Sequence, residues 1–291
     1  MKIIDVHTHG IGCFDTRTVS EEHILKFAEI QGSHGVSEIV PTVYPSSIET
    51  MRGNMRAIKE AMEIQKADGE KQKTEAKIIG VHLEGPFLNP SKRGALDPDS
   101  FINPTDHHLK QIIEGFEDIV KIITIAPELD GSFAIIKEIS DKGIMASMGH
   151  SDATYAEAEA GFHAGARCIT HIFNAMRGIH HREPGLAGFG LMNQDIYIEV
   201  IADPFHLDKK IIDFIFSVKN PGRIIIVSDS VKAADMPHPS HGICNEDNRL
   251  LGGSLTIKVA AERMIQAGIE STLVFKAISE NPREYLRPCF I

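Results

Sequence analysis

Two histidines stand 21 residues apart, and each directly follows a short apolar run. His150 comes after residues 144–148 and His171 after residues 166–170, with a helix-like segment at 153–165 between them. A strand–helix–strand unit of this kind pairs its strands in parallel, so both imidazoles are expected at one edge of a sheet. Neutral imidazole is a preferred ligand for divalent cations such as zinc. A single histidine after a strand is more often an ordinary loop residue, but two in register favour a metal site.

Two further strand ends carry similar chemistry. The first β-prone run ends in His7-Thr8-His9, and alternate residues of an extended segment point to the same side. Both imidazoles could therefore bind one cation, the alternative being a pair that faces solvent. Glu84 closely follows another apolar run, at 77–82. A carboxylate at a buried edge needs a cation or a set of donors, and we favour a metal ligand over a structural salt bridge.

The elements that position these residues alternate regularly along the chain. Eight strand-like runs are expected at residues 2–6, 37–43, 77–82, 118–125, 144–148, 166–170, 196–202 and 223–227, with helical stretches between them. This pattern predicts an α/β fold of the (β/α)8 barrel type, in which active sites lie at the carboxyl ends of the strands. Those ends carry His7, His9, Glu84, Glu128, His150, His171, His206 and Asp229.

The helix boundaries have their own signals. Residues that can cap a helix amino terminus precede four of the helical stretches, namely Ser20, Thr105, Ser132 and Asp208. The last helix is expected to end before Pro282, because proline lacks the backbone donor that a helix interior requires.

A cation held by Glu84, His150 and His171 would keep an open position for water, which is the pattern of a catalytic site. The cation would lower the pKa of that water and polarise a bound carbonyl group. Asp229, from the last strand, is then a candidate general base that could return the proton to a leaving amine. The plainer alternative is that Asp229 only caps or pairs locally.

Composition narrows the class of protein. The 291 residues fit one barrel-sized domain, expected to span 1–291. Thirty basic against forty acidic residues give a net charge of −10 without a basic cluster, which argues against nucleic acid but not against a small anionic substrate. No apolar run reaches membrane-spanning length, and no signal segment precedes the first strand. The widely spread cysteines favour free thiols in the cytoplasm; they are Cys13, Cys168, Cys244 and Cys289.

Taken together, the motifs H-x-H, H-L-E-G-P-F, G-H-S, T-H-x-F-N-A-M, H-R-E-P-G and S-D resemble those of the N-acetylglucosamine-6-phosphate deacetylases of the amidohydrolase superfamily. The similarity runs in order from His7 to Pro282. It implies hydrolysis of the N-acetyl amide of N-acetylglucosamine 6-phosphate, giving glucosamine 6-phosphate and acetate.

The resemblance also assigns residues. Glu84, His150 and His171 match the metal ligands, and Asp229 matches the catalytic acid and base. His7 and His9 match a pair that serves a second metal position in some members and is lost in others. The positions expected to bind substrate are Ala95, Leu96, Asn174, Ala175, Arg182, His206, Leu251, Gly252 and Gly253.

The resemblance further implies a cofactor and a partner. Arg182 and His206 match groups that bind the sugar phosphate, and the arginine comes from the other subunit, which implies a homodimer. Without the motif, Arg182 would be read as an ordinary surface arginine. The ligand types favour zinc and also admit iron, manganese or cobalt, and they leave open whether one ion binds or two.

Three departures from the family pattern keep alternatives open. Relatives carry a small β-sandwich built from segments before and after the barrel, and this sandwich is expected to be missing here. Leu96 stands where relatives usually have a polar residue near the scissile amide, and a leucine cannot donate a hydrogen bond. The segment between Asp229 and Leu251 is shorter than usual. The alternatives are an amidohydrolase for a different N-acyl sugar or a cyclic amide, or a catalytically impaired barrel that only binds a sugar phosphate.

Overall fold

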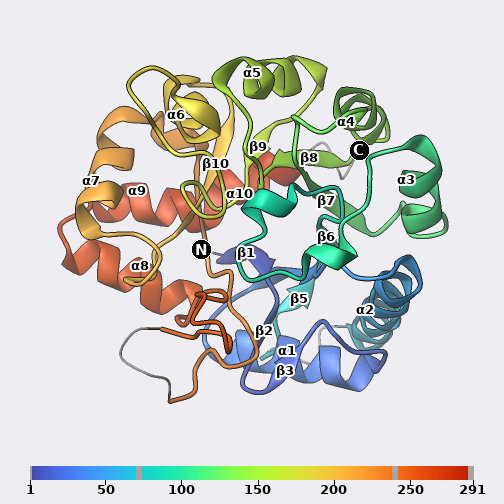
Figure 1. Cartoon of the computed structure of the whole chain (residues 1–291). Coiled ribbons are helices and arrows are strands. Elements are labelled where there is room, and N and C mark those ends of the chain that lie inside the picture. The colour runs from blue at the N-terminus through green and yellow to red at the C-terminus, as the bar shows by residue number, and fades with distance from the viewer. Residues whose placement is uncertain (1, 70–73, 238–241, 288–291) are drawn as a thin grey trace.

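The computed structural model describes residues 2–69, 74–237 and 242–287, and in this part of the chain eight parallel strands form a barrel inside a ring of helices (Figure 1). In their order around the barrel, the strands are β1 (Ile4–Thr8), β4 (Glu38–Val43), β6 (Val81–Glu84), β7 (Val120–Ile125), β8 (Met145–Met148), β9 (Cys168–Ile169), β10 (Tyr197–Ile201) and β11 (Ile224–Val227). The last strand meets the first through backbone hydrogen bonds from Asp229 N to His7 O, 2.9 Å, and from His9 N to Ser230 O, 2.8 Å. The predicted (β/α)8 barrel is confirmed.

The helices lie outside the strands. They are α1 (Glu21–Ser33), α2 (Ile48–Asp68), α3 (Asp106–Ile113), α4 (Ser132–Asp141), α5 (Tyr155–Ala164), α6 (Gly185–Met192), α7 (Lys209–Val218), α8 (Ile257–Gln266), α9 (Ser271–Phe275) and α10 (Asn281–Leu286). Two short strands, β2 (Gly10–Ile11) and β3 (Phe14–Asp15), form a hairpin directly after β1, and β5 (Lys77–Ile78) pairs with β4 just before β6. No helix among the described residues is long and apolar enough to span a membrane.

Each barrel strand is buried on both faces, because helices cover the outside and side chains fill the inside. In β11, Ile225 and Val227 belong to the cluster that fills the barrel, whereas Ile224 and Ile226 pack in the larger cluster shared with the helices. Tyr285 of α10 joins the inner cluster, so the C-terminal helix closes the amino-terminal end of the barrel. Strands buried on both faces read as continuous apolar runs, which is why the sequence pattern located them.

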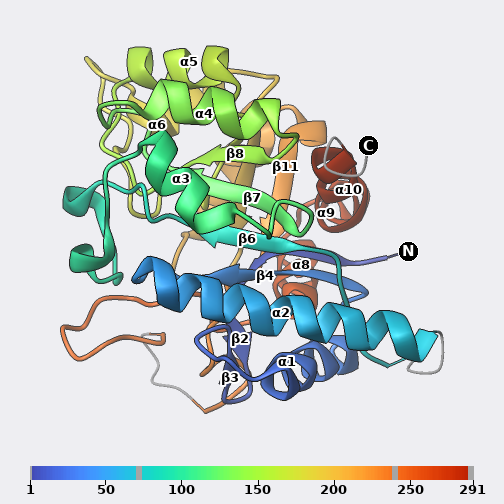
Figure 2. The same ribbon diagram turned by 90° about the vertical axis from the view of Figure 1, so that its right-hand side faces the viewer.

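Loops surround the opposite end of the barrel, where the strands have their carboxyl ends. Figure 2 shows the connections that follow β6 and β11 extending from the end of the barrel that lies away from the N terminus. Because all eight strands run in the same direction, every residue that directly follows a barrel strand is brought to this end.

Two expectations about helix ends are wrong. Ser132 does not cap α4: it is the first helical residue, its hydroxyl donates to Ala126 O, and Gly131 occupies the cap position with a φ of 87°. The last helical stretch does not end before Pro282. A π-helical turn at Lys276–Glu280 leads directly into α10, where Pro282 sits in the first turn. The π-helical turn interrupts the regular i→i−4 hydrogen-bond pattern just before this proline, which lacks a backbone donor.

Candidate active site

Three ligand atoms converge at the carboxyl ends of β6, β8 and β9. Glu84 Oε1 lies 3.2 Å from His150 Nε2 and 3.1 Å from His171 Nε2, and the two Nε2 atoms are 3.1 Å apart. A cation that binds tetrahedral ligands at roughly 2.0–2.1 Å holds their atoms about 3.3–3.4 Å apart. The three side chains, all buried, therefore have the spacing of ligands to a single divalent ion.

The hydrogen bonds of the imidazoles support this interpretation. His150 Nδ1 lies 2.9 Å from Lys92 O, and His9 Nδ1 lies 3.0 Å from Thr42 O. A carbonyl oxygen can only accept, so each ring carries its proton on Nδ1 and presents a lone pair at Nε2. Lone pairs that converge with a carboxylate oxygen repel one another, and a bound cation removes that repulsion.

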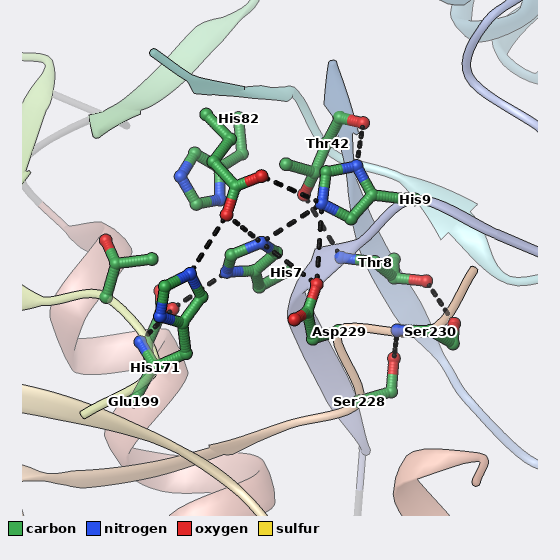
Figure 3. A network of polar contacts seen from close by, with 12 residues as sticks. His7, Thr8, His9, Thr42, His82, His171, Glu199, Ser228, Asp229 and Ser230 are labelled. Carbon is green, nitrogen blue, oxygen red and sulfur yellow. Dashed lines mark hydrogen bonds and ion pairs between the residues drawn. The ribbon is translucent and has the colours of Figure 1, made fainter. Parts of the chain in front are cut away.

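A second cluster adjoins the first. His7 and His9, at the end of β1, place their Nε2 atoms 3.3 Å apart, and each atom lies 3.4 Å from Asp229 Oδ1 (Figure 3). Glu84 connects the clusters, because Oε1 lies 3.3 Å from His7 Nε2 and Oε2 lies 3.3 Å from His9 Nε2. The chain thus offers two adjacent positions that could hold a cation, with Glu84 between them.

The backbone at three of these positions is unusual. His150, His171 and Asp229 adopt positive φ values of 45°, 30° and 46°, a region that costs non-glycine residues energy. A neighbouring glycine permits the geometry beside His150, since a Cβ on Gly149 would lie 2.7 Å from the Thr170 Cβ. Strain that recurs at the ends of three strands, where the ligand atoms meet, points to a functional constraint.

The pKa values of the protein without a cation show that several carboxylates crowd together at this site. Burial raises the pKa of Asp229 well above its ordinary value, and the carboxylates of Glu84 and Glu199 raise it further. Burial also raises the pKa of Glu84, but His150 and His171 outweigh it and hold that pKa well below the usual range. Burial lowers the pKa of His7, yet the Asp229 and Glu199 carboxylates bring it well above its ordinary value. Positive charge is favoured at the centre of this cluster.

A cavity of about 930 Å³ opens above the cluster. Its wall contains most of the residues that the sequence predicted to bind substrate, namely Ala95, Leu96, Asn174, Ala175, His206, Leu251 and Gly252. Gly253 is not in the wall; its backbone donates to Asp229 O at 2.7 Å, and a Cβ there would lie 2.0 Å from Ser228 O. Arg182 is exposed and also lies outside the wall of this cavity.

Some residues of the cavity were missed at the level of sequence. Tyr44 stacks on His9 with ring centroids 3.9 Å apart, and the Cζ atom of the Arg17 guanidinium lies 4.5 Å from the centroid of the Tyr44 ring. Lys232, on the loop after β11, is a second basic residue in the wall. Tyr44 directly follows β4, and Arg17 lies just beyond the β2–β3 hairpin that follows β1, so their position in the connections after barrel strands is the signal that could have identified them.

A (β/α)8 barrel whose strand ends bring histidines and carboxylates together at cation-ligand spacing belongs to the metal-dependent hydrolase class of barrels. A model of the amidohydrolase family matches residues 2–281. The chain therefore belongs to the amidohydrolase family, which is metal-dependent.

Known proteins of similar sequence carry deacetylase names. N-acetylglucosamine-6-phosphate deacetylase of Bacillus subtilis is 35% identical over 233 residues, covering 79% of this chain and 57% of that protein. N-acetylgalactosamine-6-phosphate deacetylase of Escherichia coli O157:H7 is 30% identical over 250 residues, covering 86% of this chain and 64% of that protein. The matches thus span less than two thirds of these relatives.

The fold has a close counterpart among solved structures. A D267A mutant of N-acetyl-D-glucosamine-6-phosphate deacetylase from Mycobacterium smegmatis, in complex with N-acetyl-D-glucosamine-6-phosphate, superposes with a TM-score of 0.87 at 25% sequence identity. The match covers 98% of this chain and 77% of the mycobacterial chain.

Proposed function

We propose that this protein is a metal-dependent hydrolase that removes the N-acetyl group of N-acetylglucosamine 6-phosphate, with residues 1–291 acting as one (β/α)8 domain. The observation that carries the proposal is the convergence of Glu84, His150 and His171, with Asp229 Oδ1 3.4 Å from the adjoining imidazoles. The names of the relatives and the sugar phosphate in the mycobacterial structure support this substrate.

The proposed roles follow from the positions of the side chains. Glu84, His150 and His171 hold a divalent cation, with zinc favoured and iron, manganese or cobalt as alternatives, and His7 and His9 offer a second position. Bound there, a divalent cation would supply Lewis acidity, which lowers the pKa of a water molecule and polarises an amide carbonyl. Asp229 accepts a proton from the attacking water and delivers it to the amide nitrogen as the carbon–nitrogen bond breaks. The products are acetate and the amine of glucosamine 6-phosphate.

The rest of the cavity binds the sugar phosphate. His206 and Asn174 stand in its wall, and His206 Nδ1 lies 3.5 Å from Asp203 Oδ1. Arg182 is exposed and lies outside the cavity of its own subunit. An arginine that reaches the cavity of a second subunit needs such an exposed position. We therefore propose a homodimer in which Arg182 binds the phosphate of the partner's substrate by its planar, two-pronged guanidinium.

We propose a cytoplasmic location because of the state of the cysteines. Cys13, Cys168 and Cys244, the three in the described part of the chain, are all free thiols, which suits the reducing cytoplasm.

The experiment is acetate release by the purified protein loaded in turn with zinc, iron, manganese and cobalt. We expect turnover of N-acetylglucosamine 6-phosphate to exceed that of unphosphorylated N-acetylglucosamine by at least tenfold, because a phosphate contact is worth about 1.4 kcal/mol or more in the transition state. Equal rates on both sugars would reject the phosphate site, and no acetate with any cation would reject the deacetylase.

One observation favours a second candidate, a hydrolase for a different N-acyl amino sugar. Leu96 stands in the cavity wall without a hydrogen-bonding side chain, and one similar protein carries a galactosamine name. Including N-acetylgalactosamine 6-phosphate and a longer N-acyl analogue in the same assay separates the two candidates, since the preferred substrate will show the highest kcat/KM.

A further inference from the structure

A glutamate lies in the middle of an otherwise apolar barrel strand. Glu199 is the third residue of β10, and its side chain points into the barrel and is completely buried. Within the described ranges no lysine or arginine pairs with it. Burying a carboxylate is costly unless strong partners offset the cost, so the contacts that Glu199 makes should explain its presence.

Those contacts lead to the candidate metal centre. Glu199 Oε2 lies 2.9 Å from His7 Nδ1, and the same oxygen accepts from the backbone N–H of His171 at 3.3 Å (Figure 3). The other oxygen, Oε1, is buried without a hydrogen-bond partner among the described residues. The carboxylate is therefore committed, through one oxygen, to the residues that surround the cation positions.

The bond to His7 sets which nitrogen of that ring is free. A carboxylate accepts the Nδ1 proton, so Nε2, which faces His9 and Asp229, is the nitrogen that would offer a lone pair to a cation. The acceptors differ among the histidines: His9 and His150 donate to backbone carbonyls, whereas His7 donates to a carboxylate. A carboxylate acceptor makes an imidazole a stronger metal ligand and fixes its orientation more firmly.

We propose that Glu199 is a positioning residue for the second cation position, the one formed by His7, His9 and Asp229. Through His7 it raises the affinity of that position, while the position of Glu84, His150 and His171 depends on it much less. The inference rests on the metal centre of the proposed function but not on the identity of the substrate.

The test is a titration of the metal-free protein with Zn²⁺, followed by calorimetry and elemental analysis. We expect the wild type to bind two ions and Glu199→Gln to keep the first ion while binding the second roughly 10–100-fold more weakly. Glutamine conserves the shape and retains an oxygen that can accept from His171 N, so the change is confined to the charge that faces His7.

Two controls separate positioning from a structural role. Asp203→Asn removes another buried carboxylate just beyond β10, one that contacts Ser254, Phe205 and His206 but none of the histidines at the two cation positions, and should leave both ions bound. The metal-free Glu199→Gln protein should melt at or above the wild-type Tm, because a neutral amide is cheaper to bury. A structural role would instead lower that Tm and leave the affinity ratio of the two ions unchanged.

The outcomes are distinct from those of the deacetylase assay. If the wild type takes up fewer than two ions at saturating Zn²⁺, or Glu199→Gln binds both ions as tightly as the wild type, the role of Glu199 is rejected even where acetate is released. If two ions bind and the variant loses the second, the role of Glu199 stands even where none of the sugars is a substrate.

Discussion

Glu84 Oε1 lies 3.1 Å from His171 Nε2, although 87 residues separate the two in the chain. The barrel brings them together because both follow parallel strands, β6 and β9, whose carboxyl ends share one rim. The contact places a carboxylate and an imidazole where both can bind one cation.

Removing the cation should lower the stability of the whole barrel. An ion at about 100 times its dissociation constant contributes about 3 kcal/mol, which a chelator removes. We expect a chelator to lower the Tm of the wild type in a thermal melt and to have little effect on His150→Ala, which has already lost a ligand. His163→Ala, in an exposed position on α5, should respond like the wild type. An unchanged wild-type Tm would contradict a cation at this site.

Asp229→Asn should abolish turnover while the first ion stays bound. The amide cannot accept the proton of the attacking water, and loss of a general base typically costs 10²–10⁴-fold in kcat. Steady-state kinetics together with elemental analysis check both halves of the prediction. Asp235→Asn, on the same loop but outside the cavity wall, is the matched control and should remain active. Near-normal turnover of Asp229→Asn would remove this residue from the mechanism.

Arg182→Ala should lose most activity on the phosphorylated sugar, and mixing should restore part of it. If the arginine serves the partner's cavity, a heterodimer of Arg182→Ala with Asp229→Asn contains one complete site. Random reassociation of these two inactive variants then restores roughly a quarter of the wild-type sites. Arg56→Ala, an exposed arginine on α2, controls for the loss of surface charge. No recovery after reassociation, in a sample that does form mixed dimers, argues that the arginine acts within its own subunit.

Leu96→His should raise turnover of an N-acetyl substrate. The side chain stands in the cavity wall, and an imidazole there can donate to the developing oxyanion, for which a single donor is commonly worth 10²–10³-fold. We expect a gain of roughly tenfold in kcat, because the new donor is not supported by its surroundings. Kinetics on the N-acetyl and longer N-acyl sugars measure it. A loss on the N-acetyl sugar would mean that leucine suits the natural acyl group.

Asp203 should contribute to the acid stability of the metal-free protein. Burial raises the pKa of Asp203, but hydrogen bonds from His206, Ser254 and the Phe205 backbone outweigh it and bring the pKa from 3.8 to about 2. A depressed folded-state pKa gives stability that is complete above about pH 4 and is lost as the pH falls toward 2. Urea unfolding should show the wild type losing its advantage over Asp203→Asn, about 1–2 kcal/mol, across that window. A pH-independent difference would contradict the shift.

The order and direction of the strands could be read directly from the residues. Strands buried on both faces appear as short apolar runs, and helices appear by caps such as Ser20, Thr105 and Asp208, whose side chains do accept from the first helical turn. In a parallel barrel each strand end faces the same rim, so local pattern was enough to place Glu84, His150 and His171 near one another. Their proximity could be predicted because it depends only on which residues follow each strand and on the common direction of the strands in the barrel.

Other features depend on contacts across the barrel and have no local signature. The bond from Glu199 to His7 joins residues 192 apart, and the stack of Tyr44 on His9 joins two different loops. A glutamate inside an apolar strand was a visible signal, but its partner depends on how the strands stagger and on which side chains meet inside. Gly253 likewise donates its backbone N–H to Asp229 O and lies outside the cavity wall, a placement that no local pattern indicates. Closing a barrel sets those distances through strand tilt and register, which are properties of all eight strands together.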